Sequence, residues 1–362
     1  MLHFTKKLIL FFLIYNPIVA DTIETFYGPV DVQEPVLLEL ITSPAFQRLK
    51  GIHQYGVSYY TTHCENYTRY DHSLGVFFLL RINNCCLEEQ IAGLLHDVSH
   101  TVFSHVGDWI FKRQHQEEDY QTLTHGNYLE RSGLSEILHK YGYTIEDVLP
   151  KKELFPALEQ PLPTLCADRI DYNLQGAFYQ GFITYQEAAR MFYEIKFIDG
   201  QWISNDYELL KKLVRFSLFM SQDCWGSATN YVHSMWLAEA ILRGLDIQII
   251  HMDDIRFGVD QEIWNCLLDS NDHLIRKNMH MILHASDYHN LVGTKQEANL
   301  LVTSKFRGID PFVIIDGKRV RLTTTDPVLA EEFQIAKNRM CDGWAIKINT
   351  AIIDGQPANI LL

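Results

Sequence analysis

The chain has 362 residues, of which 47% are hydrophobic and 21% are charged, and its formal net charge is −14. This composition is typical of a folded globular protein and excludes general disorder as the default interpretation. The negative charge repels nucleic-acid phosphates, and no run of basic residues indicates an extended nucleic-acid surface. The seven cysteines show no CxxC spacing, which argues against a disulfide scaffold and against a thiolate zinc site.

Residues 1–20 have the pattern of a cleavable secretory signal. Lys6 and Lys7 precede an apolar run that begins at Leu8, and the small residue Ala20 stands before Asp21. The run is too short for a stable membrane span. We therefore expect export to the periplasm or the medium. The alternative is a misplaced start codon or an N-terminal core helix, which would leave the protein in the cytoplasm.

Helical patterns dominate from residue 21 to about residue 244, because apolar residues recur there at spacings of three and four. The clearest segments are VLLELITSPAFQRLKGI (36–52), SLGVFFLLRI (73–82), LEEQIAGLLHDV (87–98) and YELLKKLVRFSLFMSQ (207–222). Within this region an Asp-Gly pair joins two short strand-like runs at 194–204, which predicts one β-hairpin with a type I′ turn.

The pattern changes after about residue 250. A second Asp-Gly hairpin at 311–324 precedes a helix at 326–340 that Asp-Pro opens, and residues 344–357 are strand-like. We therefore expect a mainly α fold, in which a helical core over residues 21–244 is followed by a smaller α+β C-terminal portion over residues 245–362.

The stretch QIAGLLHDVSHTVFSHVGDWI (90–110) begins as a buried helix and carries an unusual set of polar groups, which are His96, Asp97, His100, His105 and Asp108. We expect one helical stretch here. A buried helix accommodates one histidine, but burying an adjacent His-Asp pair without a partner costs several kcal/mol. A divalent cation at the side of the helix would satisfy both side chains.

Further candidate ligands occur on both sides of this pair. His72 begins an apolar helix in NYTRYDHSLGVFFLL, and Asp168 and Asp171 lie three residues apart in TLCADRIDYNLQG. The order His72, His96-Asp97, Asp168 resembles that of the HD-domain metal-dependent phosphohydrolases, and most closely the deoxynucleoside triphosphate triphosphohydrolase branch. The resemblance covers roughly residues 26–176 and implies an HD-domain helical bundle for the core.

The resemblance also implies roles for individual residues. The metal ligands would be His72, His96, Asp97 and Asp168, and the substrate contacts would be Gln54, Arg69, His100, Arg169 and Tyr172. The catalytic groups would be His105 on the phosphate side and His125 as general acid, with Asp108 orienting His125. Three alternatives stay open: His105 and Asp108 as a helix-surface pair, His125 as an exposed loop histidine, and Asp171 as a structural partner of an arginine.

Two imidazoles and two carboxylates form a mixed nitrogen and oxygen site that suits Mn²⁺, Fe, Co²⁺, Ni²⁺ or Zn²⁺, with Mg²⁺ as a further option. Four protein ligands in an octahedral shell leave about two positions for water and a substrate oxygen, which is typical of a catalytic site. We expect the metal to activate water and polarise phosphorus, while Arg69, Arg169 and protonated histidines spread the developing charge.

Two departures from the triphosphohydrolase branch bear on the substrate. Gly176 stands where the branch has an Asp that holds the sugar 3′-hydroxyl, and Trp225, Ser227 and Ala228 stand where it has Tyr, His and Lys contacts. The sequence thus predicts a phosphohydrolase that acts on a nucleotide, including deoxynucleoside triphosphates, or on another small phosphate ester, either as a monomer or as a homo-oligomer. The alternative is a catalytically idle HD module that serves as a nucleotide or metal sensor or as an exported interaction protein.

Overall fold

The computed structural model describes residues 21–62, 67–112 and 120–349. The predicted signal segment at 1–20 and the end of the predicted strand region at 350–357 lie outside the described residues, so export stays a prediction. Within these three ranges no helix combines the length and the apolar character that crossing a membrane requires.

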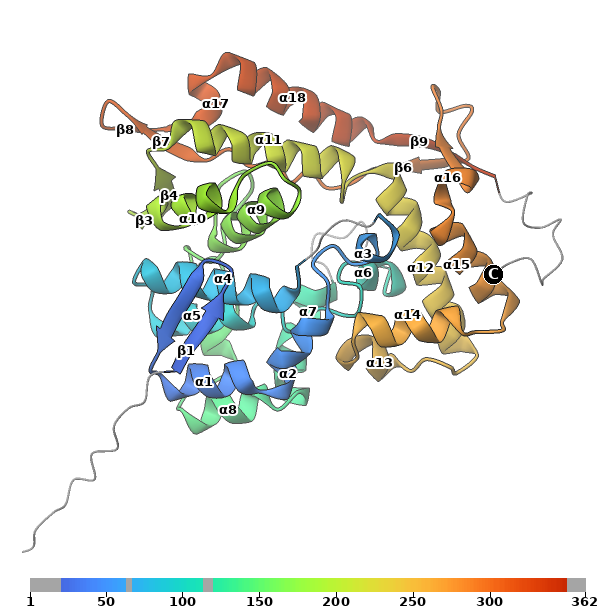
Figure 1. The fold of residues 1–362 in the computed structure, drawn as a ribbon, viewed down its shortest axis with the longest axis horizontal. Helices are drawn as coiled ribbons and strands as arrows, with labels where there is room; N and C mark the ends of the chain where they lie inside the picture. The colour runs from blue at the N-terminus through green and yellow to red at the C-terminus, as the bar shows by residue number, and fades with distance from the viewer. Residues whose placement is uncertain (1–20, 63–66, 113–119, 350–362) are drawn as a thin grey trace, which may run out of the picture.

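The fold is mainly α-helical (Figure 1). Up to residue 194 the elements are β1 (Asp21–Thr25), β2 (Gly28–Val32), α1 (Pro35–Thr42), α2 (Pro44–Gln47), η1 (Arg48–Gly51), α3 (Ser58–Thr61), α4 (Arg69–Ile82), α5 (Leu87–Leu95), α6 (Val106–Ile110), α7 (Tyr120–Arg131), α8 (Leu134–Lys140), η2 (Glu146–Val148), α9 (Ala167–Tyr179) and α10 (Tyr185–Glu194). Helix α9 packs against α4 and α10.

The remaining elements are β3 (Lys196–Ile198), β4 (Gln201–Ser204), α11 (Tyr207–Asp223), α12 (Ala228–Asp246), α13 (Met252–Phe257), α14 (Asp260–Leu268), α15 (His273–Leu283), α16 (Ala285–Tyr288), β5 (His289–Leu291), β6 (Leu300–Val302), β7 (Phe312–Ile315), β8 (Lys318–Arg321), α17 (Leu322–Thr325), α18 (Pro327–Asp342) and β9 (Trp344–Ile348). Helix α18 lies along α11, and α15 lies along α12 (Figure 1).

Two features of the N-terminal region differ from the prediction. Residues 21–32 form an antiparallel hairpin of β1 and β2 that was not predicted, with Val30 and Val32 buried on its inner face. The predicted helix at 36–52 breaks after Thr42, because the residue before a proline avoids the helical conformation. Ser43 is extended and caps α2, in which Pro44 takes the first position.

Both predicted Asp-Gly turns are confirmed. Asp199 and Gly200 have φ of 49° and 74° between β3 and β4, and Asp316 and Gly317 have φ of 50° and 73° between β7 and β8. A type I′ turn requires positive φ at both central residues, which aspartate tolerates and glycine adopts freely.

The two predicted portions are joined by β-pairing. Strand β4 pairs in parallel with β7, so the four-stranded sheet β3-β4-β7-β8 contains strands from both sides of residue 244. A second sheet, β5-β9-β6, lies wholly in the later portion. The two portions are therefore in direct contact, and the division after residue 244 stays a prediction.

Candidate metal centre

The first turn of α4 positions two candidate residues. Thr68 and Asp71 form a capping box, in which each side chain accepts a hydrogen bond from the backbone N–H of the other residue. The box fixes where the helix begins, so that Arg69 and His72 enter the interior from its first turn. His72 is fully buried.

The stretch at 90–110 is not one helix. Helix α5 ends at Leu95 with His96 as its C-terminal cap, and α6 begins only at Val106. Phe103 and Ser104 have φ of 55° and 56°, which a continuous helix excludes. The turns between Leu95 and Val106 are held by hydrogen bonds to residues far along the chain. One of these is donated by the Phe103 backbone N–H to Asp260 Oδ1 at 2.6 Å.

Helix α9 supplies the carboxylates on the other side of the site. Its N-cap is Cys166, and Asp168 lies in its first turn, where a negative charge is favoured by the helix dipole. Asp171 follows three residues later and is fully buried. Helices α4 and α9 pack directly against each other, which brings His72 to both carboxylates.

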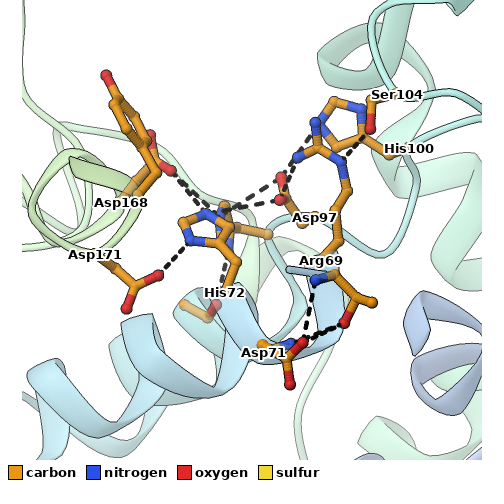
Figure 2. Close-up of polar contacts among 12 residues, drawn as sticks. Arg69, Asp71, His72, Asp97, His100, Ser104, Asp168 and Asp171 are labelled. Atoms are coloured by element: carbon orange, nitrogen blue, oxygen red, sulfur yellow. Dashed lines mark hydrogen bonds and ion pairs between the residues drawn. The ribbon is translucent and has the colours of Figure 1, made fainter. Parts of the chain in front are cut away.

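Three of the predicted ligands form a compact cluster (Figure 2). His72 Nε2 lies 3.0 Å from Asp168 Oδ1 and 3.1 Å from His96 Nε2, and His96 Nε2 lies 3.6 Å from Asp168 Oδ1. Donors at about 2.1 Å from one ion are ~3.0 Å apart when adjacent in an octahedral shell and ~4.2 Å apart when opposite. The cluster therefore fits a divalent metal ion.

Asp97, the fourth predicted ligand, lies beside this cluster. Its Oδ1 is 3.5 Å from His96 Nε2, and its Oδ2 is 3.7 Å from His72 Nε2. Arg69 Nη1 lies 2.5 Å from the same Oδ2. Burial opposes the charged form of Asp97, but Arg69 and His96 outweigh it and hold the pKa of Asp97 well below its usual value. The carboxylate is thus ionised and available to a cation.

Hydrogen bonds fix the ring orientation of both histidines. His72 Nδ1 donates to Asp171 Oδ2 at 2.6 Å, and His96 Nδ1 donates to the Gly93 carbonyl at 2.7 Å. Each ring therefore presents Nε2 to the cluster, which is the arrangement seen around metal-bound histidines. The alternative that Asp171 pairs with an arginine is wrong, since its charged partner is His72.

A proton competes with a metal for the same nitrogens. Burial alone would lower the pKa of His72, but its hydrogen bonds to Asp168 and Asp171 raise it to about 10. Burial also opposes the charged form of His96, yet Asp97 and Asp168 raise its pKa. Metal binding must displace these protons, so metal affinity depends on pH.

The two predicted phosphate-binding arginines are engaged within the protein. Buried Arg69 bridges Asp97 and Ser104, with Nε donating to Ser104 Oγ at 2.8 Å (Figure 2). Arg169 Nη1 donates to the carbonyls of Gln160 and Thr164, in the loop that precedes α9. Both guanidinium groups retain further N–H donors, and their contact with phosphate stays a prediction.

His100, His105 and Asp108 line one small pocket together with Tyr120 and Gln121. His100 Nε2 lies 3.2 Å from Asp97 Oδ1, and burial, with a contribution from Arg69, lowers the pKa of His100 to about 4. The His100 ring is therefore neutral in the free protein near neutral pH, and its predicted contact with phosphate stays a prediction. The His105 side chain is 52% exposed and lies 3.3 Å from Asp108, so the helix-surface pair describes the geometry.

His125 does not contact Asp108 as predicted. It lies on α7 and is 2% exposed, and its Nδ1 lies 2.7 Å from Ser99 Oγ. Its Nε2 is buried and has no hydrogen-bond partner in the described residues. Asp108 instead accepts a hydrogen bond from the Tyr120 backbone N–H. Burial lowers the pKa of His125 to about 4, so the ring is neutral near pH 7.

Gln54 and Tyr172 remain open to a ligand. The side-chain oxygen of Gln54 is buried without a hydrogen-bond partner in the described part of the chain. Tyr172 is half-buried one turn after Asp168, and its ring contacts Trp225 edge-on at 5.8 Å. Their predicted substrate contacts stay predictions.

Sequence reasoning missed three residues that support the site. Arg48 donates to the carbonyls of Val98 and His100, and Asp260 accepts from two backbone N–H groups, including that of Phe103. Glu159 faces the ligands from the loop before α9, and burial, together with Asp168, raises its pKa to about 7. Arg48 and Asp260 lie 50 or more residues from these partners along the chain, so no local spacing indicates them.

The comparisons with known proteins agree with this geometry. Residues 69–172 match the HD domain family. The chain is 33% identical over 328 residues to the uncharacterized protein YdhJ of Bacillus subtilis, and the match covers 90% of this chain and 98% of YdhJ. It is 35% identical over 213 residues to the metal-dependent phosphohydrolase cns2 of Cordyceps militaris, which covers 57% of this chain and 61% of cns2.

A third relative is human deoxynucleoside triphosphate triphosphohydrolase SAMHD1, which is 29% identical over 185 residues. That match covers 43% of this chain and 29% of SAMHD1. The chain thus spans nearly all of YdhJ but less than two thirds of cns2 and of SAMHD1.

Proposed function

Because the chain belongs to the HD-domain superfamily of metal-dependent phosphohydrolases, we propose that it hydrolyses a nucleotide or another small phosphate ester. The observation that carries the proposal is the cluster of His72, His96 and Asp168, with Asp97 beside it. Two imidazole nitrogens and one carboxylate oxygen converge there within 3.6 Å of one another, as the donor atoms around one ion do.

A divalent ion held by these residues would supply Lewis-acid polarisation of a phosphoryl group and would make a water molecule more acidic. The protein orients the ligands for it. Asp171 fixes the ring of His72, and the Gly93 carbonyl fixes that of His96. The mixed donor set suits Mn²⁺, Fe, Co²⁺, Ni²⁺ or Zn²⁺.

His125 is a candidate proton donor or acceptor that is not a predicted ligand, and it lies near enough to His96 and Asp97 for their charges to affect its pKa. Ser99 holds its Nδ1, which leaves the buried Nε2 to a ligand. The ring is neutral in the free protein, since its pKa is lowered to about 4 by burial. A bound phosphate dianion would raise that pKa, because a nearby negative charge favours the protonated imidazole. His125 then protonates the leaving group as the substrate binds.

The surroundings of Gly176 favour a substrate class broader than deoxynucleoside triphosphates. A Cβ at Gly176 would lie 2.7 Å from the Tyr55 hydroxyl and 3.0 Å from Phe216 Cζ. An aspartate has no room there, so the carboxylate that holds the 3′-hydroxyl in the triphosphohydrolase branch has no counterpart at this position. The Tyr55 hydroxyl fills that space instead.

Metal analysis of the purified protein, combined with a broad phosphate-ester screen, tests the proposal. Identification of the products distinguishes the release of triphosphate, pyrophosphate and phosphate. We expect bound metal and turnover in the wild type, and neither in a His96→Ala variant. Metal binding without turnover of any ester would overturn the proposal in favour of an idle HD module.

A further inference from the structure

Helix α7 carries His125, although little of its surface is buried. Most of its side chains are exposed or half-buried, and the buried ones are His125, Tyr128 and Leu129. The helix is joined to the segment with the metal ligands by His125 Nδ1, which lies 2.7 Å from Ser99 Oγ, and by Gln121 Nε2, which donates to the His96 carbonyl at 2.6 Å. Gln121 and His125 lie on one face of the helix, about one turn apart. The tilt of α7 is therefore left to other contacts.

Two adjacent residues of α13 hold α7 at two separate points. Arg256 Nε donates to the hydroxyl of Tyr120, the first residue of α7, at 2.9 Å. The Phe257 ring stacks on the ring of Tyr128, with centroids 5.1 Å apart and planes 19° from parallel. Tyr120 and Tyr128 lie about 12 Å apart along the helix axis. A helix held at both points has a fixed tilt, and His125 lies between them.

Helix α13 can support α7 because its own backbone is anchored on both sides of these two residues. The Ile255 carbonyl accepts a hydrogen bond from the Val102 N–H at 3.0 Å, and the Gly258 carbonyl accepts one from Arg48 Nε at 2.9 Å. Val102 lies in the turns after α5, and Arg48 also donates to two carbonyls of those turns. The same turns carry Ser99, the partner of His125. Helix α13 therefore fixes α7 relative to the turns that hold Ser99.

The position of His125 depends on where α7 lies. Its Nε2 is buried and has no hydrogen-bond partner within residues 21–62, 67–112 and 120–349, so Ser99 holds the ring at Nδ1 alone. A proton donor acts only from hydrogen-bond distance of the leaving group. A misplacement of about 1 Å that arises far from the reacting atoms can cost as much as roughly 10²-fold in rate. A small shift of α7 would therefore reduce proton transfer.

We propose that Arg256 and Phe257 are positioning residues, which set the distance between His125 and the substrate by holding α7 at Tyr120 and Tyr128. This inference rests on the proposed phosphohydrolase function and deepens it. Both residues act through α7, and both lie in the C-terminal portion, outside the matched HD domain. The proton-transfer step thus depends on a helix that the HD domain does not include.

Kinetics on esters with different leaving groups tests the inference. Phe257→Ala should lower kcat roughly 10- to 100-fold on esters with poor leaving groups while KM stays unchanged. Esters with good leaving groups should be hydrolysed at nearly the wild-type rate, because they leave without being protonated. Arg256→Ala should act in the same direction, and Phe257→Tyr, which keeps the stacked ring, should retain the wild-type kcat. Phe333→Ala is the matched control and should leave kcat unchanged, since this half-buried ring of α18 makes an edge-on contact with Phe306.

A double-mutant cycle separates positioning from a general loss of stability. In a His125→Ala background, Phe257→Ala should cause no further loss of kcat, because the residue that it positions is already missing. Losses that multiply in the double variant, or that are equal on good and poor leaving groups, would overturn the inference. Thermal unfolding confirms that each variant is folded, and Phe257→Leu replaces Phe257→Ala if the alanine variant is unfolded.

An NMR measurement that does not depend on turnover separates the two proposals. In the full-length, metal-stripped protein with isotope-labelled histidine, the ring resonances of His125 are assigned from their absence in His125→Ala. They should shift in Phe257→Ala and in Arg256→Ala but not in Phe333→Ala. Unchanged His125 resonances in both α13 variants would overturn the inference. A wild type that hydrolyses no ester, while the His125 resonances still depend on Phe257, would overturn the proposed function alone.

Discussion

Gly75 provides a steric test of how the metal site is built. It lies on α4, three residues after His72, and faces α9. A Cβ added at Gly75 would lie 1.9 Å from Asp171 Oδ1, 2.7 Å from Asp171 Cγ and 3.0 Å from Gln175 Nε2. The fully buried Asp171 cannot move to solvent, so Gly75→Ala should push its carboxylate away from His72 Nδ1.

The expected effect is on metal affinity. Loss of a carboxylate that orients a metal-binding histidine typically weakens metal binding 10- to 100-fold, or about 1.4–2.7 kcal/mol. Alanine also favours the helix over glycine by about 1 kcal/mol, which partly offsets the clash in the free energy of unfolding. Gly75→Ala should therefore reduce metal affinity more than it reduces the stability of the metal-stripped protein.

Chelator competition measures the metal dissociation constant, and thermal unfolding of metal-stripped protein measures stability. Gly126→Ala is the matched control, because its Cβ would meet only Ile145 Cγ2 at 3.7 Å in helix α7. Asp171→Asn keeps the volume but removes the charge, and it should weaken metal binding as Gly75→Ala does. The double variant of Gly75→Ala and Asp171→Asn should have a metal affinity no lower than that of the single variant with the lower affinity. Wild-type metal affinity in Gly75→Ala would refute the argument.

Three further predictions concern single side chains. Burial raises the folded-state pKa of Asp260 to about 7, from ~4 in the unfolded chain. Between these two pH values the folded protein keeps a proton that the unfolded chain releases. The free energy of unfolding should therefore fall as the pH rises from about 4 to about 7. Denaturant titrations of metal-stripped protein should show a smaller fall in Asp260→Asn, and equal pH slopes would contradict this. His125→Ala should lower kcat roughly 10²–10⁴-fold while the metal is retained. An ester with a good leaving group should restore most of the lost activity, because such a group leaves without being protonated. Equal losses of activity on good and poor leaving groups would exclude a proton-donor role for His125. His96→Ala should lose both metal, by elemental analysis, and activity, and retained metal would remove His96 from the ligand set.

The positions of the candidate ligands could be predicted because helix starts and ends carry local signals. The Thr68-Asp71 capping box marks where α4 begins, and the apolar run before His96 marks α5. The order of His72, His96-Asp97 and Asp168 then resembles one family. Both Asp-Gly turns could also be predicted locally, because their backbone conformation depends on two adjacent residues.

The partners of these residues could not be predicted, because they depend on packing between distant segments. The contact between Ser99 and His125 requires α7 to pack beside the turns after α5, and the nearest sequence signal instead favoured Asp108. The break in the predicted helix at 90–110 has the same origin. Val102 donates to the Ile255 carbonyl and Phe103 to Asp260, and both acceptors lie more than 150 residues away.

These long-range contacts make the C-terminal portion part of the site. The turns between α5 and α6 carry His100 and Ser104, and they are held by Asp260 and by the carbonyl of Ile255 from beyond residue 244. Without those acceptors, two backbone N–H groups of the turns would be buried unpaired, at a cost of about 1–3 kcal/mol each. Since Ser104 in turn holds Arg69 against Asp97, the charge balance around the metal depends on residues that lie outside the matched HD domain.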